Sequence, residues 1–156
     1  MTATPIRLRA EDGEDLRIVS ACLQDAILPI GDMGFLPDEK RFVMVVNRFR
    51  WESADRPRPG PTADDDHLMP FERVHCGVCV EGVSGVRLRG IDVRDRAQIL
   101  ELLSLEMVEG GIALHFAGGG CVRLDGAPWR LRLEDMGEPW PTDRKPSHTL
   151  DQTFDG

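Results

Sequence analysis

The sequence predicts an α+β domain that is largely an antiparallel β-sheet, with one main helix near the N-terminus. Three observations favour this class. Residues 12–26 repeat apolar side chains at helical spacing, most other apolar segments alternate with polar residues, and turn-forming residues separate these segments. The 156 residues, 41% of them hydrophobic, suffice for one domain with its own core, which we expect over residues 1–136.

The first predicted elements are a strand and a helix. Residues 6–9 alternate apolar and polar side chains, as a short strand does. Acidic residues follow at 11–15, at the start of the apolar helical repeat, where the helix dipole favours negative charge. We therefore predict a helix over residues 12–26, which ends before Pro29.

A β-hairpin and a loop come next. Residues 33–36 and 41–51 flank the polar turn sequence 37–40, which begins with Pro-Asp. Residues 52–70 then contain four prolines and three consecutive aspartates, so they neither bury apolar area nor pair as a strand. This composition predicts a flexible loop.

The second half of the chain continues with strands. Strand character resumes over 71–89, with a kink near 82–85, and is followed by a short helix within 92–101 and a strand over 103–107. A second hairpin is predicted where residues 112–117 and 121–125 flank three glycines.

The last predicted strand covers residues 129–133. From 137 to 156 the chain is polar and contains three prolines, so we expect a surface or disordered tail.

Both halves follow the order strand, helix, hairpin. The tripeptide Arg-Leu-Arg occurs at residues 7–9 and again at 87–89. This order suggests two pseudo-repeated halves from a fused duplication. The alternative is that the same order recurs by chance, as it does in many α+β proteins, because identities between the halves are few.

Charge and composition exclude several classes of protein. The chain carries 19 Lys+Arg against 27 Asp+Glu, a net charge of −8, which argues against nucleic-acid binding. The longest aliphatic-aromatic run, residues 42–46, falls far short of the ~20 residues that a membrane-spanning helix needs. Residues 1–10 contain no secretory signal, so we expect a cytoplasmic protein with free thiols.

Nothing in the sequence predicts a metal or a cofactor. Cys76 and Cys79 have the spacing of a metal or redox pair, but they lie within a predicted strand, where residues three apart face opposite sides. They can chelate one ion only if Gly77 makes a bulge, so we favour structural cysteines. The histidines show no metal-ligand spacing, and no phosphate-binding loop motif occurs.

Candidate ligand-binding residues gather around the predicted helix end and the strand 41–51. An acid at the C-terminal end of a helix is unfavourable, so Asp25, next to Gln24, needs a partner, and Arg48 or Arg50 is the nearest candidate. Trp51 follows these arginines directly before the flexible loop, where binding sites are common. We identify no catalytic residues.

Arginines also recur two apart on four predicted strands, at 7/9, 48/50, 87/89 and 130/132. Residues two apart share one sheet face, so these rows would form an arginine-rich face able to bind anions. The alternative is a solvated face neutralised by neighbouring acids, which we favour because like charges opposite one another are unfavourable.

Several motifs resemble a known family. These are Gln24-Asp25-Ala26, the segment 47–52 (NRFRWE), the hairpin sequence 116–120 (FAGGG) and the ending 134–137 (EDMG). Together they resemble the mostly alphaproteobacterial proteins catalogued as domain of unknown function 2948. The resemblance covers nearly the whole chain and implies a stand-alone bacterial, cytoplasmic protein, but it supplies no activity and no catalytic residues.

These observations lead to two hypotheses. The first is a small binding or interaction module without catalytic activity, which would take an unknown protein partner. The second is a protein or enzyme that binds an anionic metabolite through an arginine-rich sheet face. Neither involves nucleic acid, a membrane or a cofactor, and whether the protein is an enzyme or an oligomer stays open.

Overall fold

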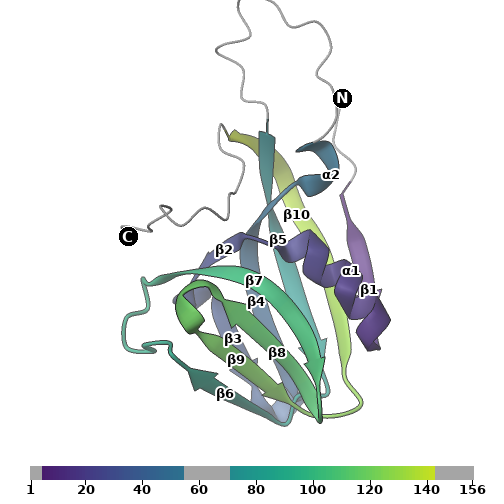
Figure 1. Cartoon of the computed structure of the whole chain (residues 1–156), viewed down its shortest axis with the longest axis vertical. Coiled ribbons are helices and arrows are strands. Elements are labelled where there is room, and N and C mark those ends of the chain that lie inside the picture. Colours follow the sequence, from purple (N-terminus) through teal and green to yellow (C-terminus); the bar gives the residue numbers. More distant parts are fainter. Residues whose placement is uncertain (1–4, 55–70, 143–156) are drawn as a thin grey trace, which may run out of the picture.

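The computed structural model describes residues 5–54 and 71–142, which form one ten-stranded sheet with a single long helix (Figure 1). Every strand pairing is antiparallel, which confirms the predicted α+β class. The strands are β1 (Arg7–Ala10), β2 (Ala26–Pro29), β3 (Met33–Leu36), β4 (Arg41–Phe49), β5 (Phe71–Glu81), β6 (Gly85–Arg89), β7 (Ile99–Val108), β8 (Gly111–Phe116), β9 (Cys121–Asp125) and β10 (Arg130–Thr142). The helical segments are α1 (Gly13–Leu23), α2 (Trp51–Ala54) and the 3-10 segments η1 (Ile30–Asp32), η2 (Pro37–Glu39) and η4 (Ala117–Gly119).

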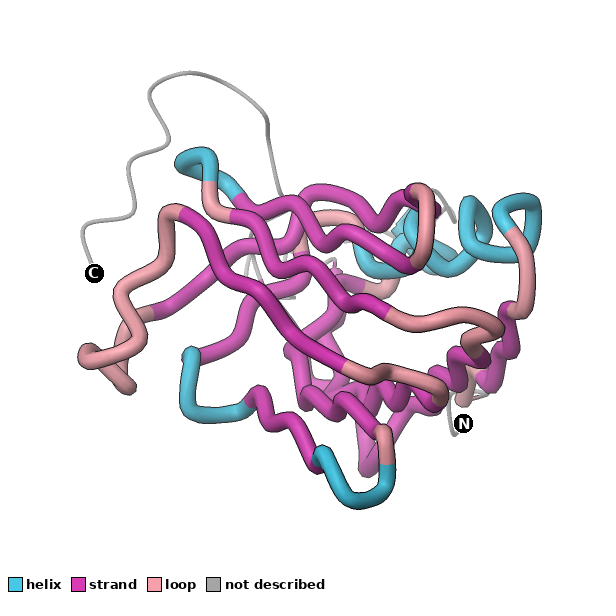
Figure 2. Tube along the Cα trace, turned by 90° about the horizontal axis from the view of Figure 1, so that it is seen from below, coloured by secondary structure: helices cyan, strands magenta, loops and turns pink. Residues whose placement is uncertain are grey.

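The strand order is β1-β10-β5-β4-β2-β7-β8-β9-β6, and β3 also pairs with β4. Seen from below, the strands do not form a flat layer but curl strongly (Figure 2). No helix in the described part of the chain is long and apolar enough to cross a membrane.

One face of the sheet carries the core. Along β4, Phe42, Met44 and Val46 are almost completely buried, while the residues between them are more exposed. The same alternation occurs on β5, where Val78 and Val80 face this core. Because successive side chains of a strand point to opposite faces, the alternating sequence pattern assigns each strand an inner and an outer face.

Helix α1 begins as predicted and ends earlier than predicted. The Asp12 side chain caps the helix by accepting a hydrogen bond from Asp15 N at 2.8 Å, and α1 buries Leu16 and Val19 against the core. The predicted end at residue 26 is wrong because Asp25 has a φ of +65°, which stops helical hydrogen bonding, and β2 begins at the next residue.

The helix predicted within residues 92–101 is also wrong. The segment 92–98 contains turns, and residues 99–101 belong to β7. Leu100 and Leu102 pair with β2 and are nearly inaccessible to solvent, so burial between neighbouring strands decides the conformation. Strand β2 was not predicted, because it has only four residues and lies next to a stronger helical pattern.

Both hairpins are confirmed. Strands β3 and β4 pair around η2, and β8 and β9 pair around η4, where Gly118 has a φ of +84° that favours glycine. The predicted strand 71–89 divides into β5 and β6, which pair with different neighbours. The second half contains no helix equivalent to α1 in its described residues, so the predicted repeat of strand, helix and hairpin is not seen.

The ends of the predicted domain shift slightly. Strand β10 continues to Thr142, past the predicted start of the tail at 137, because it re-pairs with β5 after an irregularity between Met136 and Trp140. Helix α2 occupies the beginning of the predicted loop. The remainder of that loop, residues 55–70, and the tail over 143–156 lie outside the described residues.

Candidate functional site

The predicted ligand-binding residues surround the end of β4. The indole Nε1 of Trp51 donates a hydrogen bond to Gln24 O at 2.9 Å, which joins α2 to the end of α1. The ring of Trp51 lies edge-on to Phe49, 4.6 Å between centroids. The structure thus brings residues from the helix end and from the strand 41–51 together, as the sequence predicts.

Arg48 points to the inner face of β4 and is completely buried. Its Nε and Nη2 donate to both oxygens of Asp135 at 2.9 and 2.8 Å. Its Nη1 and Nη2 donate to both oxygens of Glu52 at 2.9 and 2.7 Å, and Nη1 also donates to Phe49 O at 3.3 Å. All of its N–H groups are used within the protein, which favours a structural role.

The two carboxylates set the charge state of this cluster. Burial alone would lower the pKa of Arg48, but the hydrogen bonds to Glu52 and Asp135 outweigh it and raise that pKa. Burial likewise opposes ionisation of Asp135, yet hydrogen bonds from Arg48 and from Ile6 N lower its pKa. The cluster therefore stays ionised and ties β1, β4, α2 and β10 together.

Arg50 lies just beyond β4, is 8% exposed, and pairs with Glu72 and, at 3.4 Å, with Glu52. Its backbone N donates to Glu72 O at 2.9 Å. These contacts join the start of β5 to α2. A role of Arg50, Trp51 or Gln24 in ligand binding stays a prediction.

Asp25 belongs to a second charged cluster, on the outer face of the sheet. It is 1% exposed and lies beside the carboxyl group of Glu101 of β7. Burial and the interaction with Asp25 raise the pKa of Glu101 to about 7, while the charge of Arg73 opposes the shift. Arg73, on β5, lies 5.8 Å from the ring centre of Phe49 and donates to Asn47 O at 3.0 Å.

This arrangement bears on one expectation. The sequence suggests that Asp25 pairs with an arginine of the strand 41–51, and of these Arg48 makes its ion pairs with Asp135 and Glu52. Arg73, from the neighbouring strand β5, also interacts electrostatically with Asp25, and a pairing of Asp25 with Arg50 stays a prediction. A carboxyl group that titrates near neutrality beside a guanidinium can hold or release a proton at physiological pH.

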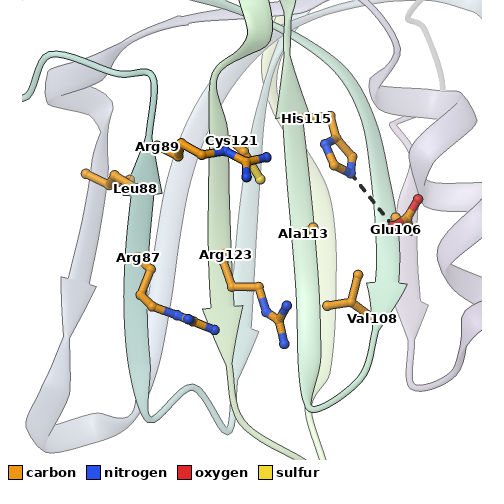
Figure 3. A pocket seen from close by; sticks show the side chains of 9 residues that line it. All are labelled: Arg87, Leu88, Arg89, Glu106, Val108, Ala113, His115, Cys121 and Arg123. Atoms are coloured by element: carbon orange, nitrogen blue, oxygen red, sulfur yellow. Dashed lines mark ion pairs between the residues drawn. The ribbon is translucent and has the colours of Figure 1, made fainter.

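The arginine rows separate into two surfaces. On the outer face of β1, β10 and β5, acids pair with three of the four arginines, in line with the favoured alternative; the ion pairs there are Arg7–Glu134, Arg130–Glu11 and Arg132–Glu81, and Arg9 forms none with a described residue. The row on β6 differs, because Arg87 and Arg89 border a hollow on the outer face of β6, β9, β8 and β7 (Figure 3).

This hollow has a volume of about 330 Å³. Figure 3 shows Arg89 extending beside Cys121, Arg87 and Arg123 lying next to each other, and His115 facing Glu106 across 3.9 Å. The nearly buried Ala113 contributes to its lining, together with Leu88 and Val108. We call these residues the arginine hollow.

Charge in the arginine hollow is unevenly compensated. Arg87 binds both oxygens of Asp125 at 2.9 Å, and Arg123 approaches the same carboxylate at 3.2 Å. Hydrogen bonding from Arg87 lowers the pKa of Asp125, so the shared carboxylate stays ionised. Arg89 forms no ion pair with any residue in the described ranges.

The cysteines follow the structural interpretation. Cys76 is buried in the core and Cys79 lies on the other face of β5, whose pairing runs through Gly77 without a shift of register. Burial, followed by the charge of Asp135, raises the pKa of Cys76 to about 12. Within residues 5–54 and 71–142, no three His, Cys, Asp or Glu side chains are grouped so that they could hold a metal ion.

Sequence reasoning missed several residues of these clusters, among them Arg73, Glu101, His115, Arg123 and Asp135. All lie on strands, and only the pairing of strands far apart in the sequence brings them together. The predicted face alternation of β5 and β9 places Arg73 and Arg123 on the outer face, but it does not identify their neighbours.

Comparison with known proteins identifies a family. A search of curated proteins finds no match, and neither does a search of solved structures. The sequence profile of a family described as "Protein of unknown function (DUF2948)" matches residues 6–148, nearly the entire chain. The chain therefore belongs to the DUF2948 family.

Proposed function

We propose that this protein binds a small polar organic anion, a carboxylate or a phosphate ester, in the arginine hollow, and that it does so without catalysis. The observation that carries this proposal is Arg89, which has no carboxylate partner in the described chain and adjoins two arginines that share Asp125. Three guanidinium groups here face two carboxylates, those of Asp125 and Glu106.

The chemistry of the lining fits such a ligand. A guanidinium presents planar, paired N–H donors that match the oxygens of carboxylates and phosphates. The chain as a whole carries a net charge of −8, so the hollow is a local exception that would attract an anion from a surface that otherwise repels it. His115 adds a ring nitrogen near the centre, while Ala113 and Val108 supply apolar contacts.

Titration calorimetry with succinate and, separately, inorganic phosphate tests the proposal. We expect Arg89→Gln to weaken binding about tenfold, because a hydrogen bond between charged groups contributes ~1.5–3 kcal/mol. Arg130→Gln is the matched control, since Arg130 is an exposed strand arginine paired with Glu11 outside the hollow. Binding should also weaken as salt concentration rises.

The competing interpretations give different results. An interaction module would capture a stoichiometric protein partner from its native extract, and Arg89→Gln would not disturb that complex. An enzyme would convert the bound anion chemically. If neither probe binds, or if Arg89→Gln and Arg130→Gln behave alike, the arginine hollow is not an anion site.

A further inference from the structure

A second, apolar pocket opens between strands β3 and β6, on the inner side of the sheet. Its lining includes Met33 and Phe35 of β3, Phe42 of β4, and Val86 and Leu88 of β6. Among the described residues, β3 pairs only with β4, and β6 pairs only with β9. The pocket therefore lies between two strands that each have, within this part of the chain, one edge without a partner strand.

The size of the pocket sets the size of its occupant. Its volume is about 170 Å³. A dry apolar cavity of about 150 Å³ accommodates benzene, so this pocket has room for one aromatic ring or a branched aliphatic group of similar size. Leu88 is 43% exposed and Val93, also on the lining, is 51% exposed, so a bound hydrocarbon group would cover apolar surface that now faces water.

One charged residue, Arg96, borders the pocket. It lies on the connection between β6 and β7, which η1 anchors through a hydrogen bond from Gly31 N to Arg96 O at 3.1 Å. No described residue forms an ion pair with Arg96. Arg94, two residues earlier, is paired with Asp92 at 3.4 Å and does not line the pocket.

We propose that this pocket binds a small aromatic or branched aliphatic monocarboxylate. The hydrocarbon group occupies the apolar space between β3 and β6, and the carboxylate pairs with Arg96. Charge complementarity selects an acid over a neutral compound, and the pocket volume selects a single ring over a larger group.

This pocket, which we call the β3–β6 pocket, is separate from the arginine hollow. Val86 and Leu88 alternate along β6 with Arg87 and Arg89, so the two pairs of side chains face opposite sides of the strand. Leu88 borders both sites, but Arg89 lines only the arginine hollow and Arg96 lines only the β3–β6 pocket. Val86 is opposite Leu124 and Leu88 is opposite Val122, both core residues of β9. The two sites can therefore be tested independently.

The test is an NMR titration of the full chain with phenylacetate as probe, with methyl groups observed. We expect saturable shifts at Ile30, Val86, Leu88 and Val93. Acetate, which lacks the ring, and benzyl alcohol, which lacks the charge, should each bind at least about tenfold more weakly, because each removes one of the two interactions.

Three variants connect the shifts to the pocket. Arg96→Gln should weaken phenylacetate binding about tenfold, and Arg94→Gln, on the same exposed segment, should leave it unchanged. Val86→Phe should fill the space and abolish binding, and its own spectrum reports whether the variant is folded. Arg89→Gln should have no effect on phenylacetate, so failure of this site and failure of the arginine hollow are distinguishable.

Several outcomes would overturn the proposal. These are an absence of saturable shifts up to millimolar phenylacetate, equal binding of phenylacetate and benzyl alcohol, and equal behaviour of Arg96→Gln and Arg94→Gln. A further one is that an extended peptide perturbs the backbone amides of β3 and β6 while phenylacetate does not. That result would assign the unpaired edges to strand addition by a protein partner instead.

Discussion

At the scale of single residues, Arg48 shows how an unfavourable burial is compensated. Moving a guanidinium out of water costs several kcal/mol, and only good geometry with further hydrogen bonds offsets that cost. Here Asp135 and Glu52 each bind it through two oxygens, and Ile6 N satisfies Asp135 further at 2.9 Å. The cost of burying the Arg48 guanidinium is offset only while both carboxylates are present.

We therefore predict a large loss of stability in Arg48→Ala. The substitution leaves the buried Asp135 without its main partner, and breaking a buried pair in this way costs about 3–5 kcal/mol. Urea denaturation followed by circular dichroism measures the loss. Arg130→Ala, which removes an exposed pair with Glu11, should cost at most ~1 kcal/mol. Equal losses in the two variants would show that the Arg48 cluster contributes no more than a surface ion pair.

Glu101 predicts a pH dependence of a definite sign. Its pKa rises from 4.5 to about 7 on folding, so between these values the folded chain binds a proton that the unfolded chain has released. The free energy of unfolding therefore falls as pH increases through this window. Glu101→Gln cannot ionise, so it should be more stable than the natural protein at pH 8 by roughly 1–2 kcal/mol, allowing for solvent screening of a partly exposed group.

Denaturation series at several pH values check this prediction. The stability difference between the two proteins should grow from pH 4 to pH 8 and should be small at the acidic end. Glu106→Gln serves as the control, because Glu106 lies on the same strand but is 62% exposed. A Glu101→Gln profile parallel to that of the natural protein would mean that Glu101 titrates normally.

At the scale of elements, local patterns predict those parts whose conformation depends on nearby residues. Helix α1 has an N-cap at Asp12, acidic residues in its first turn and an apolar stripe, all within fifteen residues of sequence. The hairpin turns are similarly local. β2 and the first residues of β7 pair with each other, and that pairing is not visible in the sequence of either.

The contact between α1 and β7 shows the same limit of prediction from local sequence. Strand β2 pairs with β7 only as far as Leu102, and beyond that residue α1 lies beside β7. Ser20 Oγ accepts a hydrogen bond from Leu105 N at 2.9 Å, so a helix side chain satisfies a strand amide. Helical periodicity shows which face of α1 is apolar, but it cannot show that a polar residue at the border of that face binds another element.

The candidate sites follow the same rule. Sequence reasoning identifies Arg48, Asp25 and Trp51 because each is unusual in its local setting, an arginine in an apolar strand or an acid at a helix end. Glu52, four residues after Arg48, is a local partner, but Asp135, which also binds Arg48, and Glu101, which interacts with Asp25, lie on distant strands. The identity of a partner depends on sheet order, and sheet order is a property of the whole chain.

At the scale of the whole molecule, the sheet joins the two halves of the sequence at several places. β1 pairs with β10, β10 with β5, and β2 with β7, so strands from the two halves pair with one another. If the two halves were equivalent, β1 would have the same pairing within the first half as β6 has within the second. β6 instead pairs with β9 within its own half, whereas β1 depends on the last strand of the chain. Strands of both halves thus enclose one shared core, and the halves do not form two similar cores.

The same architecture predicts that the segment 55–68 can be removed. Strands β4 and β5 are antiparallel neighbours paired up to Phe49 and Arg73, and Arg50 N donates to Glu72 O at 2.9 Å beyond them. The rings of Phe49 and Phe71 lie 5.7 Å apart at the same place. The chain on either side of the segment is therefore held together without it, and shortening a loop changes the closure entropy only by ~0.6 kcal/mol per halving of its length.

We expect a chain that lacks residues 55–68, but keeps α2 and Glu52, to melt within about 4 °C of the natural protein, because a change of 1 kcal/mol corresponds to at least ~2–4 °C for a domain of this size. A thermal melt followed by circular dichroism measures this. A longer deletion that also removes α2 is the informative comparison, since it takes Glu52 away from Arg48 and should cost far more than the loop itself. If the deletion of 55–68 alone lowers the midpoint by more than about 8 °C, the acidic run 64–66 is bound to the arginines of the folded domain, and the segment is part of the fold.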